Sequence, residues 1–96
     1  MAEATVRIPG PLRPYAGGRS EVVVALPHAP LPLDTLLRLL GVDCPGVLAR
    51  TLDERGALRR HMNVFVGDEN ARDLDGLQTP VHDGAEVSII PAISGG

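Results

Sequence analysis

Two glycines at the end of the sequence, Gly95 and Gly96, are the residues best suited to take part in chemistry. Because glycine has no Cβ, it leaves the walls of a narrow active site free and adopts backbone angles that are closed to other residues. A carboxylate at the end of such a tail can enter a partner enzyme and react there with a nucleotide. The pair therefore predicts that the Gly96 carboxylate is a substrate position; the alternative is a frayed terminus without a function.

The single cysteine, Cys44, is a second candidate. One cysteine excludes an internal disulfide and a zinc site made of several cysteines. Cys44 directly precedes Pro45, which suits the first turn of a short helix, so we expect it to cap or pack at that helix start. The alternative is a nucleophile or an acceptor of persulfide sulfur.

The remaining reactive side chains form no recognisable enzyme site. The histidines His28, His61 and His82 are spread along the chain without the spacing of metal ligands, so no metal site is expected. His82-Asp83 lies in a turn and has no serine or cysteine motif beside it. Gly17-Gly18-Arg19-Ser20 precedes a strand, whereas phosphate binding needs a helix N-terminus. We therefore expect neither an enzyme nor a tightly bound cofactor.

Composition indicates one small domain that binds neither nucleic acid nor membrane. The 96 residues include 22% charged side chains and carry a formal charge of −3. The longest basic stretch is Arg59-Arg60, and Phe65 and Tyr15 are the only aromatic rings, which disfavours nucleic-acid binding. No apolar run reaches transmembrane length and residues 1–9 lack the features of a signal peptide. We expect a cytoplasmic protein that is a monomer when free.

All nine basic residues are arginine, and lysine is absent. One interpretation is the nucleotide composition of the coding sequence. The other is that a protein with a periodically activated C-terminus avoids amines that would trap it. Under both interpretations the chain has no side-chain amine that could react with its own activated end.

The apolar pattern predicts strands at both ends of the chain and a helix between them. The leucines of 33–40 recur at i, i+3, i+4 and i+7, which is typical of one helix face, with Gly41 as the expected stop. A short second helix is expected from Pro45 to near Gly56, and the Gly- and Pro-rich segment Gly10–Ser20 is expected to be a loop. Alternation of period two predicts strands at Ala4–Pro9, Glu21–Leu26, Arg59–Gly67 and Ala85–Pro91, with a short one around Ala71–Leu74.

These elements predict an α+β fold, in which a mixed sheet packs on one main helix. Pro91, which lacks an N–H, is expected to end the last strand ladder, giving a domain over 1–91 and a flexible tail over 92–96. The residues expected to be buried together are Leu36, Leu37, Leu40, Val64, Val66, Val87 and Ile89.

The end of the chain carries a specific resemblance. Residues 85–96, AEVSIIPAISGG, resemble the C-terminus of the ubiquitin-like sulfur carriers of the ThiS/MoaD family. Matches upstream extend the resemblance over nearly the whole chain: Ile8-Pro9, Leu12-Arg13-Pro14, Gly17-Gly18 and Asn63–Glu69. The resemblance implies a β-grasp (ubiquitin-like) fold.

The resemblance also implies a cycle carried out by partner enzymes. An E1-like enzyme uses ATP to adenylate the Gly96 carboxylate, and a sulfur donor then converts it to a thiocarboxylate. A sulfur-accepting synthase takes up the sulfur. In the members that serve cysteine biosynthesis, a metalloprotease then releases the cysteine formed on the carrier. The Pro27–Pro32 segment is longer here than in those members, and the sequence leaves the sulfur acceptor open.

Strand parity adds a candidate surface for these partners. Phe65 and Ile90 lie opposite the core residues of their strands, which places them on the outer face of the sheet beside the tail. The alternative is two apolar residues that are exposed without consequence. Their position on neighbouring strands favours a partner-binding patch, which we expect to continue along the chain through Ala92, Ile93 and Ser94.

Three other functions fit the same residues. A ubiquitin-like modifier would join Gly96 to lysines of other proteins. The small subunit of a molybdopterin-synthase-like enzyme would keep its tail inserted in a large partner. A generic β-grasp binding module would not need the two glycines at all.

Overall fold

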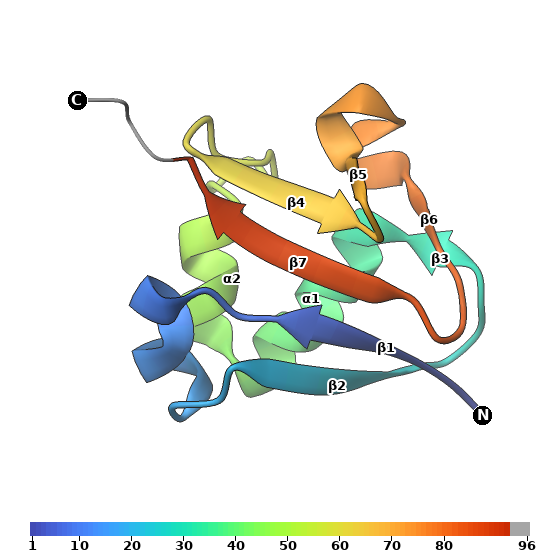
Figure 1. Ribbon diagram of the computed structural model, residues 1–96, viewed down its shortest axis with the longest axis horizontal. Helices are drawn as coiled ribbons and strands as arrows, with labels where there is room; N and C mark the ends of the chain where they lie inside the picture. Colours follow the sequence, from blue (N-terminus) through green and yellow to red (C-terminus); the bar gives the residue numbers. More distant parts are fainter. Residues whose placement is uncertain (93–96) are drawn as a thin grey trace.

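The computed structural model describes residues 1–92. Five of its strands form a mixed sheet in the order β2-β1-β7-β4-β5. The C-terminal strand β7 is central, because it runs parallel to β1 on one side and antiparallel to β4 on the other (Figure 1). The strands of this sheet are β1 (Ala2–Arg7), β2 (Glu21–Leu26), β4 (Met62–Val66), β5 (Glu69–Asn70) and β7 (Glu86–Pro91).

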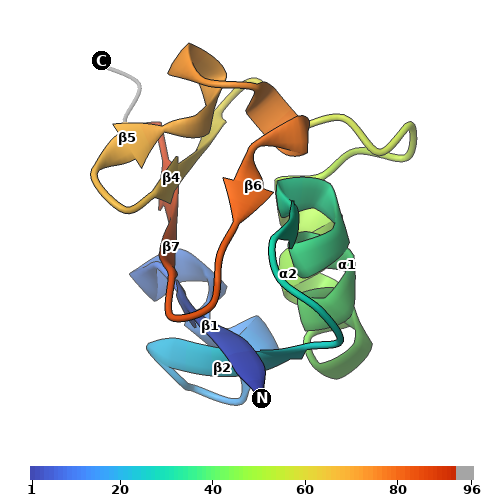
Figure 2. The same ribbon diagram turned by 90° about the vertical axis from the view of Figure 1, so that its right-hand side faces the viewer.

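The main helix, α1 (Leu33–Asp43), covers one face of the sheet (Figure 2). Its leucines at 33, 36, 37 and 40 are all buried, as the helical spacing predicts. The shorter α2 (Pro45–Thr51) packs against α1 and against the 3-10 helix η1 (Gly10–Ala16). The predicted α+β class is confirmed. No helix within residues 1–92 is long and apolar enough to cross a membrane.

The core lies between α1 and the sheet and is almost entirely aliphatic. Alternate residues of β2 enter it, so that Val22 and Val24 are buried while Val23 is 59% exposed on the outer face. Val66, at the end of β4, is only partly buried, in contrast to the prediction. The other predicted core residues are buried: Leu36, Leu37, Leu40, Val64, Val87 and Ile89.

The predicted stop of α1 at Gly41 is wrong, because the helix continues to Asp43. A Cβ at Gly41 would lie 2.9 Å from Cβ and 3.0 Å from Cγ of Leu48 in α2. Gly41 therefore allows the two helices to approach closely and does not form a left-handed turn. Local sequence could not predict this, because Leu48 reaches Gly41 only after α2 has packed on α1.

Two predictions of local structure are wrong. The predicted loop at 10–20 contains η1, which buries two side chains against the core. The strand expected around Ala71–Leu74 is instead the 3-10 helix η2 (Ala71–Asp73). This helix is favoured because the Asn70 side-chain oxygen accepts a hydrogen bond from the Arg72 N–H, which caps its first turn.

Some short elements carry no signal in the apolar pattern. β3 (Leu31–Pro32) pairs with β6 (Pro80–Val81) beside the helix, and η3 (Gly76–Gln78) precedes β6. Two-residue strands are too short for alternation of period two to indicate. The expected end of α2 near Gly56 is also wrong: the helix ends at Thr51, because Leu52 is extended and forms a bridge to Leu58.

Candidate functional site

The predicted tail begins at the corner of the sheet where β7 ends and β4 starts. Ala92, the last residue that the structure describes, donates a hydrogen bond of 2.6 Å from its N–H to the His61 carbonyl oxygen. We call this corner the tail root. The remaining predicted residues of the tail lie outside the described part of the chain: Ile93, Ser94, Gly95 and Gly96.

Pro91 ends β7, as predicted, although one further hydrogen bond toward the β4 side follows it, from Ala92. Pro91 lies opposite Met62 of β4. Amides of successive strand residues point to opposite neighbours, and the Ala92 N–H points to β4, so the Pro91 nitrogen faces away from β4. The missing N–H therefore removes no hydrogen bond to β4.

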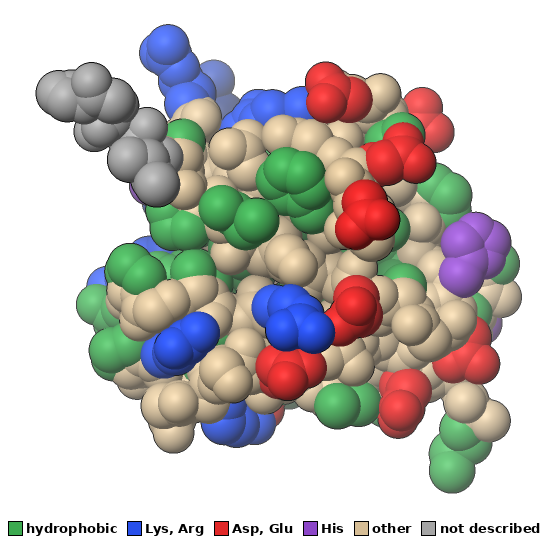
Figure 3. Space-filling view, viewed as in Figure 1, with side chains coloured by type: hydrophobic (Ala, Val, Ile, Leu, Met, Phe, Trp, Pro, Cys, Tyr) green, Lys and Arg blue, Asp and Glu red, His purple; other side chains and the backbone are tan. Residues whose placement is uncertain are grey.

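Phe65 and Ile90 lie on the outer face of the sheet, as their strand parity predicts. Ile90 is 44% exposed and Phe65 is partly buried. Phe65 is opposite Ser88 and Ile90 is opposite Asn63, so the two apolar side chains are diagonal neighbours across the ladder. Figure 3 shows hydrophobic side chains over β4 and β7 on this face.

We refer to Phe65, Ile90 and the exposed Ala92 as the outer patch. Partner binding by the outer patch stays a prediction. An ion pair borders it on the β1 side, with Arg7 Nη2 2.7 Å from Glu86 Oε1. The hydrogen bond to Glu86 raises the pKa of the Arg7 guanidinium. Because both side chains are largely exposed, solvent screens this pair, and it forms a polar border more than a source of stability.

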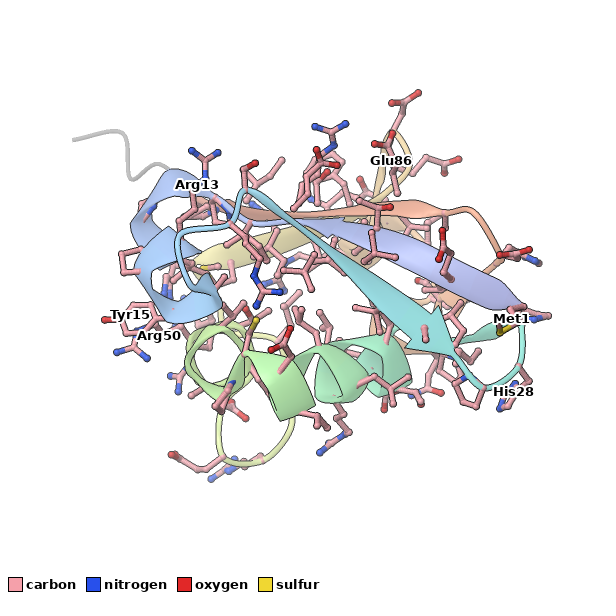
Figure 4. All side chains as sticks on the ribbon, turned by 90° about the horizontal axis from the view of Figure 1, so that it is seen from below. Met1, Arg13, Tyr15, His28, Arg50 and Glu86 are labelled. Carbon is pink, nitrogen blue, oxygen red and sulfur yellow. The ribbon has the colours of Figure 1, made fainter. Side chains whose placement is uncertain are left out.

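A basic pocket of about 380 Å³ lies beside the tail root, lined by Ala49, Arg50, Arg59 and His61. The Arg50 guanidinium stacks on the Tyr15 ring, 3.6 Å from its centroid, and the two side chains lie together in Figure 4. Arg59 Nε donates a hydrogen bond of 3.1 Å to the Ala49 carbonyl oxygen. In the sequence, Arg59 is part of the basic pair Arg59-Arg60, but nothing near it indicates a second arginine at the same site. Arg50 reaches the pocket only because α2 packs on η1.

Cys44 packs between the two helices and caps neither of them with its side chain, so the packing interpretation is confirmed. Burial raises the pKa of the Cys44 thiol and the Asp43 carboxylate raises it further, while Arg19 opposes the shift. A fully buried thiol that stays protonated is a poor nucleophile. The structure therefore disfavours Cys44 as a sulfur acceptor.

The histidines form no common site. His28, His61 and His82 are all exposed and lie in three different connections between the helices and strands. Within residues 1–92 there is no group of three or more His, Cys, Asp or Glu side chains that could hold a metal ion. His61 contributes to the tail root in two ways: its carbonyl oxygen accepts the hydrogen bond from Ala92, and its side chain lines the basic pocket.

Comparison with known proteins adds a family and several relatives. Residues 6–96 match the ThiS family. Sulfur carrier protein CysO of Mycobacterium tuberculosis is 36% identical over 94 residues, which cover 96% of this chain and 97% of that protein. Small archaeal modifier protein 3 of Haloferax volcanii is 33% identical over 61 residues, covering 64% of this chain and 65% of that protein.

Solved structures agree with the sequence relatives. The crystal structure of M. tuberculosis CysO has a TM-score of 0.84 at 35% identity and covers 94% of this chain and 99% of its own. A chain of the Amycolatopsis orientalis BexX/CysO complex has a TM-score of 0.85 at 33% identity, covering 97% of this chain and 99% of its own. The likeness thus extends over nearly the whole chain in both comparisons.

Proposed function

The chain belongs to the ThiS family and has the β-grasp fold of its sulfur-carrier relatives, and from this premise we propose that its Gly96 carboxylate carries sulfur as a thiocarboxylate. The observation that carries the proposal is the extent of the family match, which runs to residue 96 and so includes Gly95-Gly96. The relatives are carriers, which supports a protein cosubstrate and not a catalyst.

The proposed cycle needs two steps on a partner, an E1-like enzyme. In the first, a Gly96 carboxylate oxygen attacks the α-phosphorus of ATP, and pyrophosphate leaves. In the second, a donor sulfur attacks the acyl-adenylate carbonyl, and AMP leaves. When the donor is a persulfide, a thiol must then reduce the acyl disulfide to free the thiocarboxylate. ATP and the sulfur donor are therefore used by the partner, and no cofactor needs to reside in the carrier.

The outer patch supplies a surface for docking in this proposal. Ile90 precedes the tail by a few residues and Phe65 lies diagonally across from it, so a partner that receives the tail covers both. The relative from A. orientalis was crystallised in complex with BexX, which supports a role exercised through another protein. The same argument applies to the synthase that accepts the sulfur.

For the acceptor, we propose the cysteine-type route. The support is the similarity to CysO over nearly the full length of both chains. In that route the thiocarboxylate sulfur would add to an acceptor held by a synthase, an acyl shift would leave cysteine amide-linked to Gly96, and a metalloprotease would release it. Another sulfur metabolite requires only a different synthase, since the carrier's reacting group is the same.

A second candidate function is protein modification, in which Gly96 is joined to lysines of other proteins. The similarity to small archaeal modifier protein 3 favours it. Isopeptide adducts of the carrier in cell extract would support this function. A large subunit that co-purifies with the chain would instead support a molybdopterin-synthase-like role.

Mass spectrometry of the intact chain tests the proposal. Incubated with its activating enzyme, ATP and a sulfur donor, the chain should gain the mass of one sulfur in place of one oxygen, and the change should map to Gly96. Omitting ATP should abolish the gain, because sulfide does not displace hydroxide from an unactivated carboxylate at a useful rate. Sulfur transfer by a chain that lacks Gly96 would refute the proposal.

A further inference from the structure

The basic pocket at the tail root is preorganised for an anion. Stacking on Tyr15 and a hydrogen bond of 3.1 Å from Nη1 to the Gly46 carbonyl oxygen fix the Arg50 guanidinium. The bond from Nε to the Ala49 carbonyl oxygen fixes Arg59 and leaves its terminal nitrogens for other partners. Because both guanidinium groups are held in place before a ligand arrives, little side-chain freedom is lost on binding.

Within residues 1–92 no carboxylate forms an ion pair with Arg50 or Arg59, although Asp53 lies close enough to Arg59 for the two charges to interact. The ion pairs within residues 1–92 are Arg7–Glu86 and Arg19–Asp43, and neither involves Arg50 or Arg59. The residues that line the pocket include no carboxylate. On the face drawn in Figure 3, Asp and Glu side chains lie mainly over the half away from the end of β7, with Arg side chains toward that end.

We propose that this pocket receives carboxylate side chains at the rim of the activating enzyme's entrance. The inference rests on the proposed function, since it names the chemistry of the partner that takes up the tail. Arginine suits this role because it stays charged and its planar fork binds a carboxylate through two hydrogen bonds.

The position of the pocket selects a carboxylate over the phosphates of ATP. Ala92 is hydrogen-bonded to His61, which lines the pocket, and Gly96 is the fourth residue after Ala92. An extended chain of four residues spans about 14 Å. An enzyme that adenylates Gly96 therefore holds ATP at the far end of the tail, and what meets the pocket is the protein surface around the entrance.

Binding of the carrier to its activating enzyme, measured by calorimetry without ATP, tests the inference. Arg50→Gln and Arg59→Gln should each raise Kd by about tenfold, the change expected for loss of one charge-assisted contact. Both should also flatten the dependence of log Kd on log salt concentration. Arg38→Gln is the matched control, because Arg38 is exposed on α1 and lines a different pocket. It should bind like the wild type.

Two further variants keep the result interpretable. Arg59→Lys retains the charge and should recover part of the affinity, whereas a purely structural role of Arg59 would leave the lysine variant as weak as Arg59→Gln. Thermal unfolding checks that each variant folds. A double variant Arg50→Gln/Arg59→Gln that binds as tightly as the wild type overturns the inference.

The assay separates this inference from the proposed function. If the double variant still becomes a thiocarboxylate at the wild-type rate, the sulfur-carrier function stands and the basic pocket has no part in docking. If the wild-type chain gains no sulfur at all, the proposed function fails. At constant ionic strength, replacing chloride by inorganic phosphate should change Kd of neither the wild type nor the double variant. Selective weakening of the wild type by phosphate at constant ionic strength would show a phosphate site and overturn the assignment to carboxylates.

Discussion

Replacing Phe65 by alanine removes the largest side chain of the outer patch without touching the core. Phe65 is already partly buried in the free chain, so a partner adds only the remainder of its burial. Full burial of such a side chain contributes about 1.5–3 kcal/mol, and alanine at an aromatic anchor costs more than the transfer of its surface alone. We therefore expect Phe65→Ala to weaken binding to the activating enzyme by about 1–3 kcal/mol.

That free energy corresponds to a Kd raised roughly 5- to 150-fold, which calorimetry resolves. The matched control is Val23→Ala. Val23 is 59% exposed on the same outer face but lies on β2, which is separated from β7 by β1. A contact at the outer patch should therefore be lost in Phe65→Ala and kept in Val23→Ala, while both variants unfold close to the wild-type midpoint.

Two results would refute the reasoning. An unchanged Kd for a folded Phe65→Ala variant would show that the partner does not cover the outer patch. Equal losses in Phe65→Ala and Val23→Ala would show a general loss of apolar contact and not a defined surface. Ile90→Ser provides an independent check, since Ile90 is diagonal to Phe65 and should weaken binding as well.

Three further predictions concern stability and the reactive end. Gly41→Ala should destabilise the chain by about 1–3 kcal/mol in urea unfolding, because the clash with Leu48 outweighs the gain of about 1 kcal/mol in helix propensity; a more stable variant would contradict this. Backbone N–H groups of Ala57 and Arg55 donate to the Asp53 carboxylate and lower its pKa. The ionised Asp53 therefore stabilises the folded chain above about pH 4, and this contribution is lost as the pH falls through the lowered pKa. The stability difference between wild type and Asp53→Asn should therefore shrink between pH 7 and pH 3, and a constant difference would argue against it. With ATP and activating enzyme but no sulfur donor, acyl-adenylated chain that has left the enzyme should react with the new amine of Arg60→Lys, which displaces AMP and forms an amide. The amide is detected as loss of one water from the intact mass and should not form in Arg38→Lys; no product in either variant would favour nucleotide composition as the reason for the missing lysines.

Period-two alternation and helical spacing predicted the long elements because one face of each is buried. β2 has the predicted bounds, Glu21–Leu26, and the leucine stripe of α1 enters the core. The same parity places Phe65 and Ile90 on the outer face. In these cases the periodicity of a few neighbouring residues is enough to predict both the element and its buried face.

The failures share a different cause, which is contact between distant residues. Gly41 resembles a helix stop in the sequence, and only the packing of Leu48 against it explains why α1 continues past it. The basic pocket is the clearest case, because Arg50 and Arg59 come from separate segments and converge only through α2 and η1. No local pattern contains that arrangement.

The placement of β7 connects the stability of this domain with its proposed chemistry. Val87 and Ile89 fix the strand in the core, while Ile90 of the same strand points outward. The Ala92 N–H donates a hydrogen bond to the His61 carbonyl oxygen. A partner that covers the outer patch therefore contacts β7, the strand that leads to the proposed reacting carboxylate. The buried residues of β7 fix the position of this strand relative to the core. In the proposed cycle, a change of the terminal atoms of Gly96 from carboxylate to adenylate to thiocarboxylate would require no rearrangement of the buried residues, because Gly96 follows this anchor in the sequence. A rigid sheet thus suits a carrier that passes from one enzyme to another with the same docking surface and a different end group each time.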